Sequence, residues 1–506
     1  MEYYDPRDYD LAGRIAKLKT LHGIIEAPYL FPVIDPLRQI PRLEDIAKIG
    51  FNAFITNAYL FYRRNKGVAK DIHDFFHWKK PIMTDSGGYQ ILLYGSVEIS
   101  NKEIVEYEKS IGTDIAVILD IPTGSKMSIN EVWDAVHETI RRAWEALPLI
   151  MDSKQLWVLP IQGAPYIEPL LYSAKISSTT PYHIYALGSP TVYLEKYAYE
   201  DILEFTILAR INLPAEKPLH VFGVGHPMII PFLVAVGADL FDSASYILYA
   251  RDERLMFEWG TRRLDELQYL PCNCPVCTKY SVEELRSLSK RQRVELIALH
   301  NLYVLKKELD HVKQAIKDGR LWEYLEYRSK AHPMLRKAFN VIKKYRGYLE
   351  KYNPYTKASG QAILLINNDS VYHPRLEMNK KITYQVLTGI TIKKLLLVPA
   401  ISKPFNQDSV FTEFKKKYET FKILFYHPYL GLFPPELVNT FPYFQHEIGE
   451  IALNRKIVKE IVDKIRELRP SEVLIVKIDK PVYAELAEDL VRDLKDKIAK
   501  VNVIHA

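Results

Sequence analysis

Polar residues that can do chemistry follow short apolar segments throughout the first half of this sequence. They are Asp85, Asp120, Gln162, His226 and Asp242, and Gly188 has the corresponding position after a further apolar segment. Carboxylates gathered in one pocket can transfer protons and act as nucleophiles, so three of them together mark a candidate catalytic site. Each Asp could instead cap the helix that follows its apolar segment. Their association with Gln162 and with paired glycines favours a functional site.

The segment MTDSGGYQ surrounds the first of these acids with residues suited to a flat ligand. Gly87 and Gly88 let the backbone approach a bound molecule closely, because no side chain stands in the way. Tyr89 could then stack on a planar ring. A buried core tyrosine is the alternative interpretation, but the position of Tyr89 beside Asp-Ser-Gly-Gly favours stacking.

A second group of residues has the spacing of metal ligands. The only three cysteines, Cys272, Cys274 and Cys277, are crowded into CNCPVC, and His300 follows on a segment with helical periodicity. Three thiolates and one imidazole complete a closed tetrahedral zinc site with no position left for water, so the predicted ion is structural. Three free core cysteines beside an unrelated histidine are the alternative. The tight C-x-C-x2-C spacing favours one metal, also over a disulfide framework.

The elements that must position these residues have the pattern of alternating strands and helices. Eight apolar segments read as strands, at 23–31, 52–60, 81–86, 115–120, 156–163, 182–189, 218–226 and 238–244. Helical spacing separates most of them, as in residues 101–112 and 129–147. Eight such units over about 250 residues predict an α/β fold of the (β/α)8 TIM-barrel type, whose C-terminal strand ends meet at one mouth. A doubly wound sheet alternates similarly, but no GxGxxG follows the first strand.

The whole chain is too long for one hydrophobic core. Its 506 residues predict two or three domains, and 48% apolar residues are enough to bury each of them. The first residues lack an apolar leader, and no later stretch has the ~18 apolar residues of a membrane span, so we expect a cytoplasmic protein. A net charge of +6 excludes a charge-dominated tail protein and permits local basic faces for an anionic partner.

The domain boundaries follow from changes in pattern after the eighth strand. Residues 1–345 are predicted to form the barrel domain, with a zinc-binding subdomain and helical extension at about 265–345. Residues 290–351 are helical and basic, with Trp322, Tyr324 and Tyr327 among the charges, which suits a nucleic-acid backbone. A solvated helix face explains the same charges. Residues 353–506 predict one or two small α/β domains.

Six motifs together resemble those of the tRNA-guanine transglycosylases. They are MTDSGGYQ, VILDIP, LPIQG, ALGS, LFDSASY, and CNCPVC with the distant His300, in the family's order. The segment LFDSASYILYA resembles the archaeal, archaeosine-forming branch. The resemblance covers about residues 1–345 and implies a base exchange. Guanine in a tRNA is cut from its ribose and replaced by a 7-deazaguanine through a covalent enzyme–RNA intermediate.

By motif, this resemblance implies a role for each candidate residue. Asp242 would attack C1′ of the ribose, and Asp85 would be general acid and base for the departing and arriving purine. The base would be held by Ser86, Asp120, Gln162, Gly188 and Ser189, with Tyr89 stacked on it. Retaining glycosidases divide the work between two carboxylates in the same way. Asp120 and Gln162 supply an acceptor and a donor for a guanine edge, and the target base must leave its stack to reach them.

The resemblance also implies substrates and partners. The incoming base would be 7-cyano-7-deazaguanine (preQ0) and the target position 15 of the tRNA D arm, while queuine-type exchange at the anticodon stays open. We expect His226 to contact RNA, because barrels often hold phosphate near the seventh strand end. The terminal PUA-type module of archaeal relatives is not evident at KIAKVNVIHA, which suggests a separate PUA-domain partner. A homodimer is also open.

Two other classes of function fit part of the sequence. A non-catalytic, zinc-containing tRNA-binding subunit would keep the barrel and the metal site but lose catalytic acids, and here both Asp85 and Asp242 are present. A zinc hydrolase unrelated to RNA needs an open coordination position, which His300 closes as a fourth ligand. A stable covalent adduct with tRNA distinguishes the transglycosylase from both.

Overall fold

The computed structural model describes residues 3–88, 99–353, 361–449 and 452–506. The chain forms two compact units, the first comprising Met1–Lys317 and Tyr327–Tyr345, the second Asp318–Glu326 and Arg346–Ala506. Among the residues in these ranges, no helix combines the length and the apolar character needed to cross a membrane.

The first unit is built on a barrel of eight parallel strands. In chain order these are β4 (Tyr29–Pro32), β5 (Phe54–Asn57), β6 (Ile82–Asp85), β7 (Ile115–Val117), β8 (Leu156–Ile161), β9 (Ile184–Leu187), β10 (Leu219–Val221) and β11 (Leu240–Ser243). β11 pairs with β4, and a parallel bridge between Val33 and Ile55 joins the ends of the sheet. The TIM barrel predicted from the sequence is therefore confirmed.

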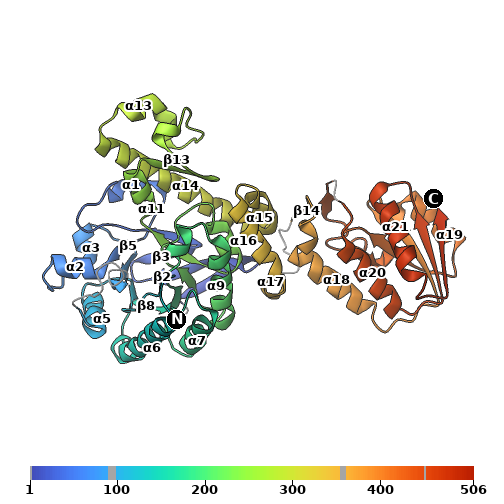
Figure 1. The fold of residues 1–506 in the computed structure, drawn as a ribbon, viewed down its shortest axis with the longest axis horizontal. Coiled ribbons are helices and arrows are strands. Elements are labelled where there is room, and N and C mark those ends of the chain that lie inside the picture. Colours follow the sequence, from blue (N-terminus) through green and yellow to red (C-terminus); the bar gives the residue numbers. More distant parts are fainter. Residues whose placement is uncertain (1–2, 89–98, 354–360, 450–451) are drawn as a thin grey trace. The chain divides into compact units, whose positions relative to one another are not determined.

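Helices surround these strands, as Figure 1 shows for α5, α6, α7 and α9. The helices of this region are α1 (Leu43–Ile49), α2 (Ala58–Arg64), α3 (Ile72–Phe76), α5 (Asn101–Ser110), α6 (Ile129–Ile150), α7 (Ile167–Ser177), α8 (Thr191–Leu194), α9 (Tyr199–Asn212), α10 (Ile230–Ala235) and α11 (Ser245–Arg251). Ser100 and Ser128 begin α5 and α6, and each forms a capping box with the glutamate three residues later. Val132, Val136 and Ala143 then bury one face of α6 at helical spacing.

A three-stranded antiparallel sheet covers the end of the barrel where the strands begin. It consists of β1 (Tyr4–Asp10), β2 (Gly13–Thr20) and β3 (Gly23–Ala27). The predicted first strand at 23–31 is therefore divided between two sheets, because Pro28 has no N–H and interrupts it. The barrel strand starts only at Tyr29.

Arg14 and Asp239 connect this small sheet to the barrel. The Arg14 guanidinium donates to both carboxylate oxygens of Asp239, at 2.7 and 2.8 Å. The Tyr4 hydroxyl and the backbone N–H of Leu219 also donate to Asp239, at 2.7 and 2.8 Å. Asp239 is fully buried. These donors, which come from both sheets, therefore compensate the buried negative charge of Asp239.

A hairpin and a series of helices follow the barrel. They are β12 (Arg254–Phe257), β13 (Gly260–Arg263), the 3₁₀ turn η1 (Leu264–Glu266), α12 (Pro275–Lys279), α13 (Val282–Ser287), α14 (Lys290–Asp318), α15 (Leu321–Ser329), α16 (Pro333–Lys344) and α17 (Arg346–Tyr352). The helical segment predicted before His300 is two helices. Ser289 exchanges hydrogen bonds with Gln292, and this capping box begins α14 as a helix separate from α13.

The second unit contains a five-stranded sheet with helices on both faces. Its order is β17 (Gly431–Phe433), β16 (Lys422–His427), β15 (Lys394–Pro399), β19 (Glu472–Lys477) and β20 (Lys500–His505), with β17 alone antiparallel. Along β15, Leu395 and Leu397 pack in one apolar core, and Leu396 and Val398 in the other. A strand buried on both faces reads as a continuous apolar run, which is why LLLV was recognisable.

The remaining elements of this unit complete the two cores. They are β14 (Ile363–Leu365), η2 (Ser370–Tyr372), α18 (Pro374–Val386), η3 (Phe405–Gln407), α19 (Ser409–Lys417), η4 (Pro435–Leu437), β18 (His446–Ile448), α20 (Arg455–Glu467) and α21 (Pro481–Leu494). Ile457 and Ile461 of α20 belong to the first core, and Phe411 and Phe414 of α19 to the second.

Replacing Arg14 tests the connection between the small sheet and the barrel. We expect Arg14→Met to lower the free energy of unfolding by about 3–5 kcal/mol, because Asp239 is left as an uncompensated buried charge. Urea denaturation followed by circular dichroism measures the change. The control is Arg7→Met, which removes an exposed pair with Asp5 and should change stability by less than about 1 kcal/mol. Equal effects of the two substitutions would contradict the role assigned to Asp239.

Candidate active site and metal centre

A cavity of about 640 Å³ opens where the barrel strands finish. The predicted site residues that line it are Asp85, Asp120, Gln162, Gly188, Ser189, His226 and Asp242. Ser86 is not among the lining residues; it is fully buried and its hydroxyl donates to the Ile118 carbonyl at 3.0 Å. Tyr89 lies outside the described residues. The fold thus brings together residues that are spread over almost half of the first unit.

Asp85 is the last residue of β6 and sits among other polar groups. Asn57, its neighbour in register at the end of β5, donates to Asp85 Oδ2 at 3.0 Å. Burial and the negative charges of Asp120 and Asp242 raise the pKa of Asp85 to about 7, although the Gly87 N–H and Asn57 act in the opposite direction. A carboxyl group with this pKa can both donate and accept a proton near neutrality.

Asp120 and Gln162 form a buried pair beside it. Gln162 Nε2 donates to Asp120 Oδ2 at 2.5 Å. Gln162 Oε1 accepts from the Thr123 N–H and hydroxyl at 3.1 Å and from the Ser189 hydroxyl at 3.2 Å, which fixes the orientation of the amide. Burial raises the pKa of Asp120 to about 6, against the hydrogen bond from Gln162. The pair presents a carboxylate and an amide N–H to the same cavity.

Two glycines give this pair its space. A Cβ atom at Gly88 would lie 2.1 Å from Asp120 Oδ1, and one at Gly188 would lie 2.2 Å from Gln162 Nε2. Both distances are far below van der Waals contact, so any side chain there would displace the carboxylate or the amide. Ser189 follows in the left-handed region at φ 64°, an uncommon conformation for a residue other than glycine.

Asp242, on β11, is oriented by two donors. His220 Nε2 lies 2.8 Å from Asp242 Oδ1, and the Gly223 N–H donates to the same oxygen at 3.1 Å. His220 is fully buried and stacks on Phe31, with ring planes 10° apart. Sequence reasoning missed His220 and Asn57. Both are polar residues in otherwise apolar strands, which was the available signal. The acid that each of them contacts depends on how the strands are arranged in the barrel, which the local sequence does not show.

The sequence predicted His226 at the end of the seventh strand, and this prediction is wrong. β10 ends at Val221, and His226 follows in an irregular segment. A Cβ atom at Gly225 would lie 2.1 Å from the Ser243 Cβ, so the segment packs too closely against β11 to continue as a strand. His226 Nδ1 accepts from the Met228 N–H at 3.2 Å. Burial and the nearby Arg328 lower the pKa of His226 to about 4, so the ring is neutral.

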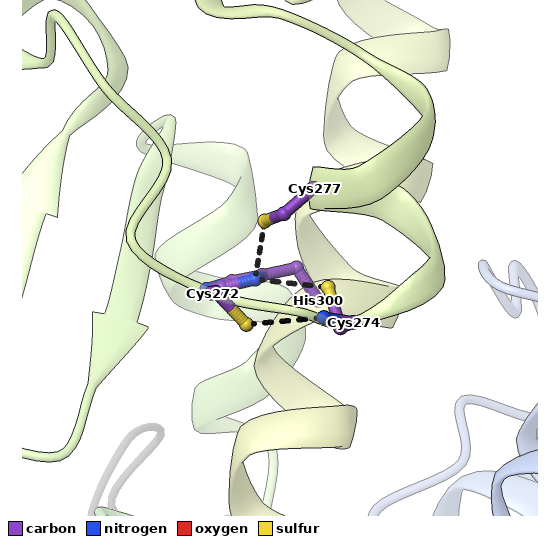
Figure 2. A group of neighbouring side chains, drawn as sticks. All are labelled: Cys272, Cys274, Cys277 and His300. Carbon is purple, nitrogen blue, oxygen red and sulfur yellow. Dashed lines mark hydrogen bonds between the residues drawn. The ribbon is translucent and has the colours of Figure 1, made fainter.

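The predicted metal ligands form one cluster in a separate part of the first unit. Figure 2 shows the three cysteines grouped around the ring of His300, which comes from α14. Cys274 Sγ and Cys277 Sγ lie 3.4 and 3.3 Å from His300 Nδ1, and all four ligand atoms lie within 4.8 Å of one another. Ligands bound at about 2.0–2.3 Å to one tetrahedral ion are separated by about 3.5–3.8 Å. The cluster therefore fits one metal ion.

Neighbouring groups orient the histidine of this cluster. His300 Nε2 donates to the Met256 carbonyl at 2.9 Å, which leaves the Nδ1 lone pair facing the sulfur atoms. The Asn301 side chain accepts from the Met256 N–H at 2.8 Å and so holds β12, the strand that contains Met256, against α14. Such outer hydrogen bonds fix the tautomer of metal-binding histidines. The imidazole is therefore held in the tautomer and orientation that metal binding requires.

Comparison with known proteins identifies the family. Residues 9–334 match the family described as Queuine tRNA-ribosyltransferase. This chain therefore belongs to the tRNA-guanine transglycosylases, a family of pentosyltransferases. The family resemblance inferred from the six motifs is confirmed.

Three relatives that match this chain over nearly its whole length have the name tRNA-guanine(15) transglycosylase. The protein from Sulfolobus acidocaldarius is 40% identical over 467 residues, 92% of each chain. That from Aeropyrum pernix is 40% identical over 469 residues, 91% of each chain. The Pyrobaculum aerophilum protein is 39% identical over 482 residues, 94% of this chain and 95% of its own.

Removing one cysteine tests the metal centre. We expect Cys277→Ser to lose the bound ion and to unfold at a lower temperature, because a closed metal site contributes folding energy. Elemental analysis and thermal unfolding with and without chelator measure both effects. The neighbouring exposed substitution Lys279→Ala is the control and should retain the ion. A metal-free Cys277→Ser protein with unchanged thermal stability would contradict a structural role.

Proposed function

We propose that this chain exchanges guanine at position 15 of the tRNA D arm for preQ0, through a covalent bond between Asp242 and the ribose. The family match supports base exchange on tRNA, and the names of the relatives support guanine 15. The observation that carries the proposal is the different environments of two acids, Asp85 and Asp242, at one barrel mouth. Asp85 has a near-neutral pKa, and Asp242 is oriented by His220 and Gly223.

The proposed reaction uses these two carboxyl groups in turn. Both donors to Asp242 contact Oδ1, so Oδ2 is the oxygen that attacks C1′. As the bond from C1′ to guanine N9 breaks, its electron pair goes to the base and protonated Asp85 supplies the proton. Asp85 then takes a proton from the incoming base, whose nitrogen displaces Asp242 from C1′. The free carboxylate and the protonated Asp85 are restored.

The Asp120–Gln162 pair would recognise the base. The Asp120 carboxylate can accept from the N1–H and the exocyclic amino group of guanine, and the second N–H of Gln162 can donate to O6. The fixed orientation of the Gln162 amide supports this assignment, because Thr123 and Ser189 occupy its oxygen. A 7-deazaguanine presents the same edge. Both substrates of the exchange would therefore bind in one pose.

Zinc is the ion we propose for the cysteine cluster, and its role there is structural. Three thiolates and an imidazole are a preferred zinc ligand set, and four protein ligands leave no position for substrate. The expectations of a PUA-domain partner, a homodimer and a cytoplasmic location stay predictions.

Labelled preQ0 and a purified tRNA transcript test the proposed exchange. We expect incorporation into wild-type tRNA, none when guanine 15 is replaced by adenine, and a loss of at least about a thousandfold with Asp242→Asn, because the nucleophile is gone. The affinity for tRNA should change little, since phosphate contacts remain. Denaturing gels detect the covalent adduct.

The matched control is Asp252→Asn, at an exposed position just beyond α11, which should retain activity. Incorporation at the anticodon instead of position 15 would favour queuine-type exchange. Substantial turnover by Asp242→Asn would remove Asp242 from the nucleophile role.

The charges around Asp85 lead to a prediction about pH. Adduct formation needs the acid form of Asp85, so its single-turnover rate should fall as the pH rises through about 7. Asp120→Asn removes one of the charges that raise this pKa, and the Asp85 carboxyl should then titrate at lower pH. Carbon-detected NMR of the carboxyl groups follows the titration without requiring activity. Asp74→Asn, at an exposed site, is the control. An unchanged Asp85 titration in Asp120→Asn would show that these carboxylates are not coupled.

A further inference from the structure

A second cluster of potential ligands lies at the end of the barrel opposite the cavity. His22 is in the turn between β2 and β3, His73 is on α3, and Asp114 immediately precedes β7. His22 Nδ1 lies 3.1 Å from Asp114 Oδ1, and His73 Nε2 lies 3.2 Å from Asp114 Oδ2. The three ligand atoms are all within 4.8 Å of one another. Neither the family resemblance nor the proposed exchange assigns these residues a role.

Backbone hydrogen bonds hold the carboxylate of this cluster in place. Asp114 is fully buried and accepts from the backbone N–H of His22 at 2.8 Å and of Ile82 at 2.9 Å. These bonds place one oxygen toward each histidine. The nearby Asp71 adds a further negative charge that acts on His73. The location therefore favours a positive charge.

His73 presents an acceptor to this carboxylate. Its Nδ1–H donates to the Trp78 carbonyl at 2.8 Å, which leaves the lone pair on Nε2 in the neutral ring. The side chain is 8% exposed, and Nε2 faces the buried Asp114 Oδ2 at 3.2 Å. Two acceptors at this distance require a cation or a proton between them. A histidine that donates its other N–H to a carbonyl is also the usual arrangement in metal sites.

His22 completes the ligand set and provides access from solvent. Its side chain is 39% exposed, and its ring lies 3.7 Å from the His73 ring, centroid to centroid. Two imidazoles and one carboxylate form a donor set suited to borderline divalent ions such as Zn²⁺, Co²⁺ and Ni²⁺. A carboxylate or imidazole ligand bonds such an ion at about 2.0–2.2 Å, which is consistent with ligands 3.1–3.2 Å apart.

We propose that His22, His73 and Asp114 form a second metal site, which binds a borderline divalent transition-metal ion with water at the remaining position. The ion would join the β2–β3 turn and α3 to the start of β7. It would lie away from the reacting groups, which line the cavity at the other strand ends. The site is independent of the proposed base exchange, so failure of either proposal leaves the other standing.

A proton is the alternative occupant of the space between His73 and Asp114. Burial lowers the pKa of His73, but the bonds to Asp114 and to the Trp78 carbonyl and the charge of Asp71 outweigh it and raise the pKa. A metal ion must displace this proton. The binding measurement therefore belongs above neutral pH, with protein that carries no affinity tag.

Cobalt distinguishes the two metal sites of the full chain. Protein whose cysteine cluster is filled with zinc is titrated with Co²⁺ and analysed by equilibrium dialysis and absorption spectroscopy. We expect one further ion per chain, with weak ligand-field bands and without the intense thiolate charge-transfer bands that cobalt at the cysteines would produce. His22→Ala should lower the affinity for this ion by at least about tenfold, because one ligand is lost.

The design keeps the outcome independent of folding defects. His22→Ala preserves the backbone bond from residue 22 to Asp114, and the exposed His137→Ala on α6 is the matched control. His137→Ala should bind cobalt like the wild type. The proposal is overturned if the zinc-filled wild type takes up no further ion, or if His22→Ala takes it up with unchanged affinity. NMR titration that shows His73 doubly protonated in the presence of excess cobalt would identify the proton as the occupant.

Discussion

The crowding of buried and half-buried carboxylates at one barrel mouth is the constraint on which the rest of the site depends. Asp85, Asp120 and Asp242 share a cavity, and in these poorly solvated surroundings the charges of Asp120 and Asp242 act on Asp85. The protein accommodates them by giving each a different environment. Asp242 has His220 and Gly223, Asp120 has Gln162, and Asp85 has the Gly87 N–H and the amide of Asn57. Asp85 is the acid on which burial and both neighbouring charges act, and its pKa rises to about 7.

The barrel supplies the means for this arrangement. Parallel strands that all finish at one end bring Asn57, Asp85 and Asp242, from β5, β6 and β11, to the same mouth of the barrel. Glycines then permit the close approach of Asp120 and Gln162 to the backbone. The opposite end of the same strands has another task. Asp114 and Asp239 both precede strands there, and both bind groups from the small antiparallel sheet.

The sequence could predict the acids and Gln162, but not Asn57 and His220, which contact Asp85 and Asp242. Strand period and the position of Asp85 after an apolar run are local properties, and so is the cysteine spacing. The contact between His220 and Asp242 arises only when β10 and β11 pair, and His22, His73 and Asp114 meet only after the small sheet docks. The strand predicted through His226 was too long, because the fit of Gly225 against Ser243 is a tertiary property. Tyr89 lies outside the described residues, so its stacking role stays a prediction.

The bond between Arg14 and Asp239 also constrains how this chain can be made. The two residues are 225 positions apart, and β4, an early strand, finds its second neighbour only in β11. On the ribosome, a chain that grows by about 5–20 residues per second keeps that strand edge open for tens of seconds or less. During this interval the Arg14 guanidinium and the β4 edge have no native partner on one side. Ring closure is thus a late event of synthesis, and the first residues to emerge are among the last to reach their final contacts.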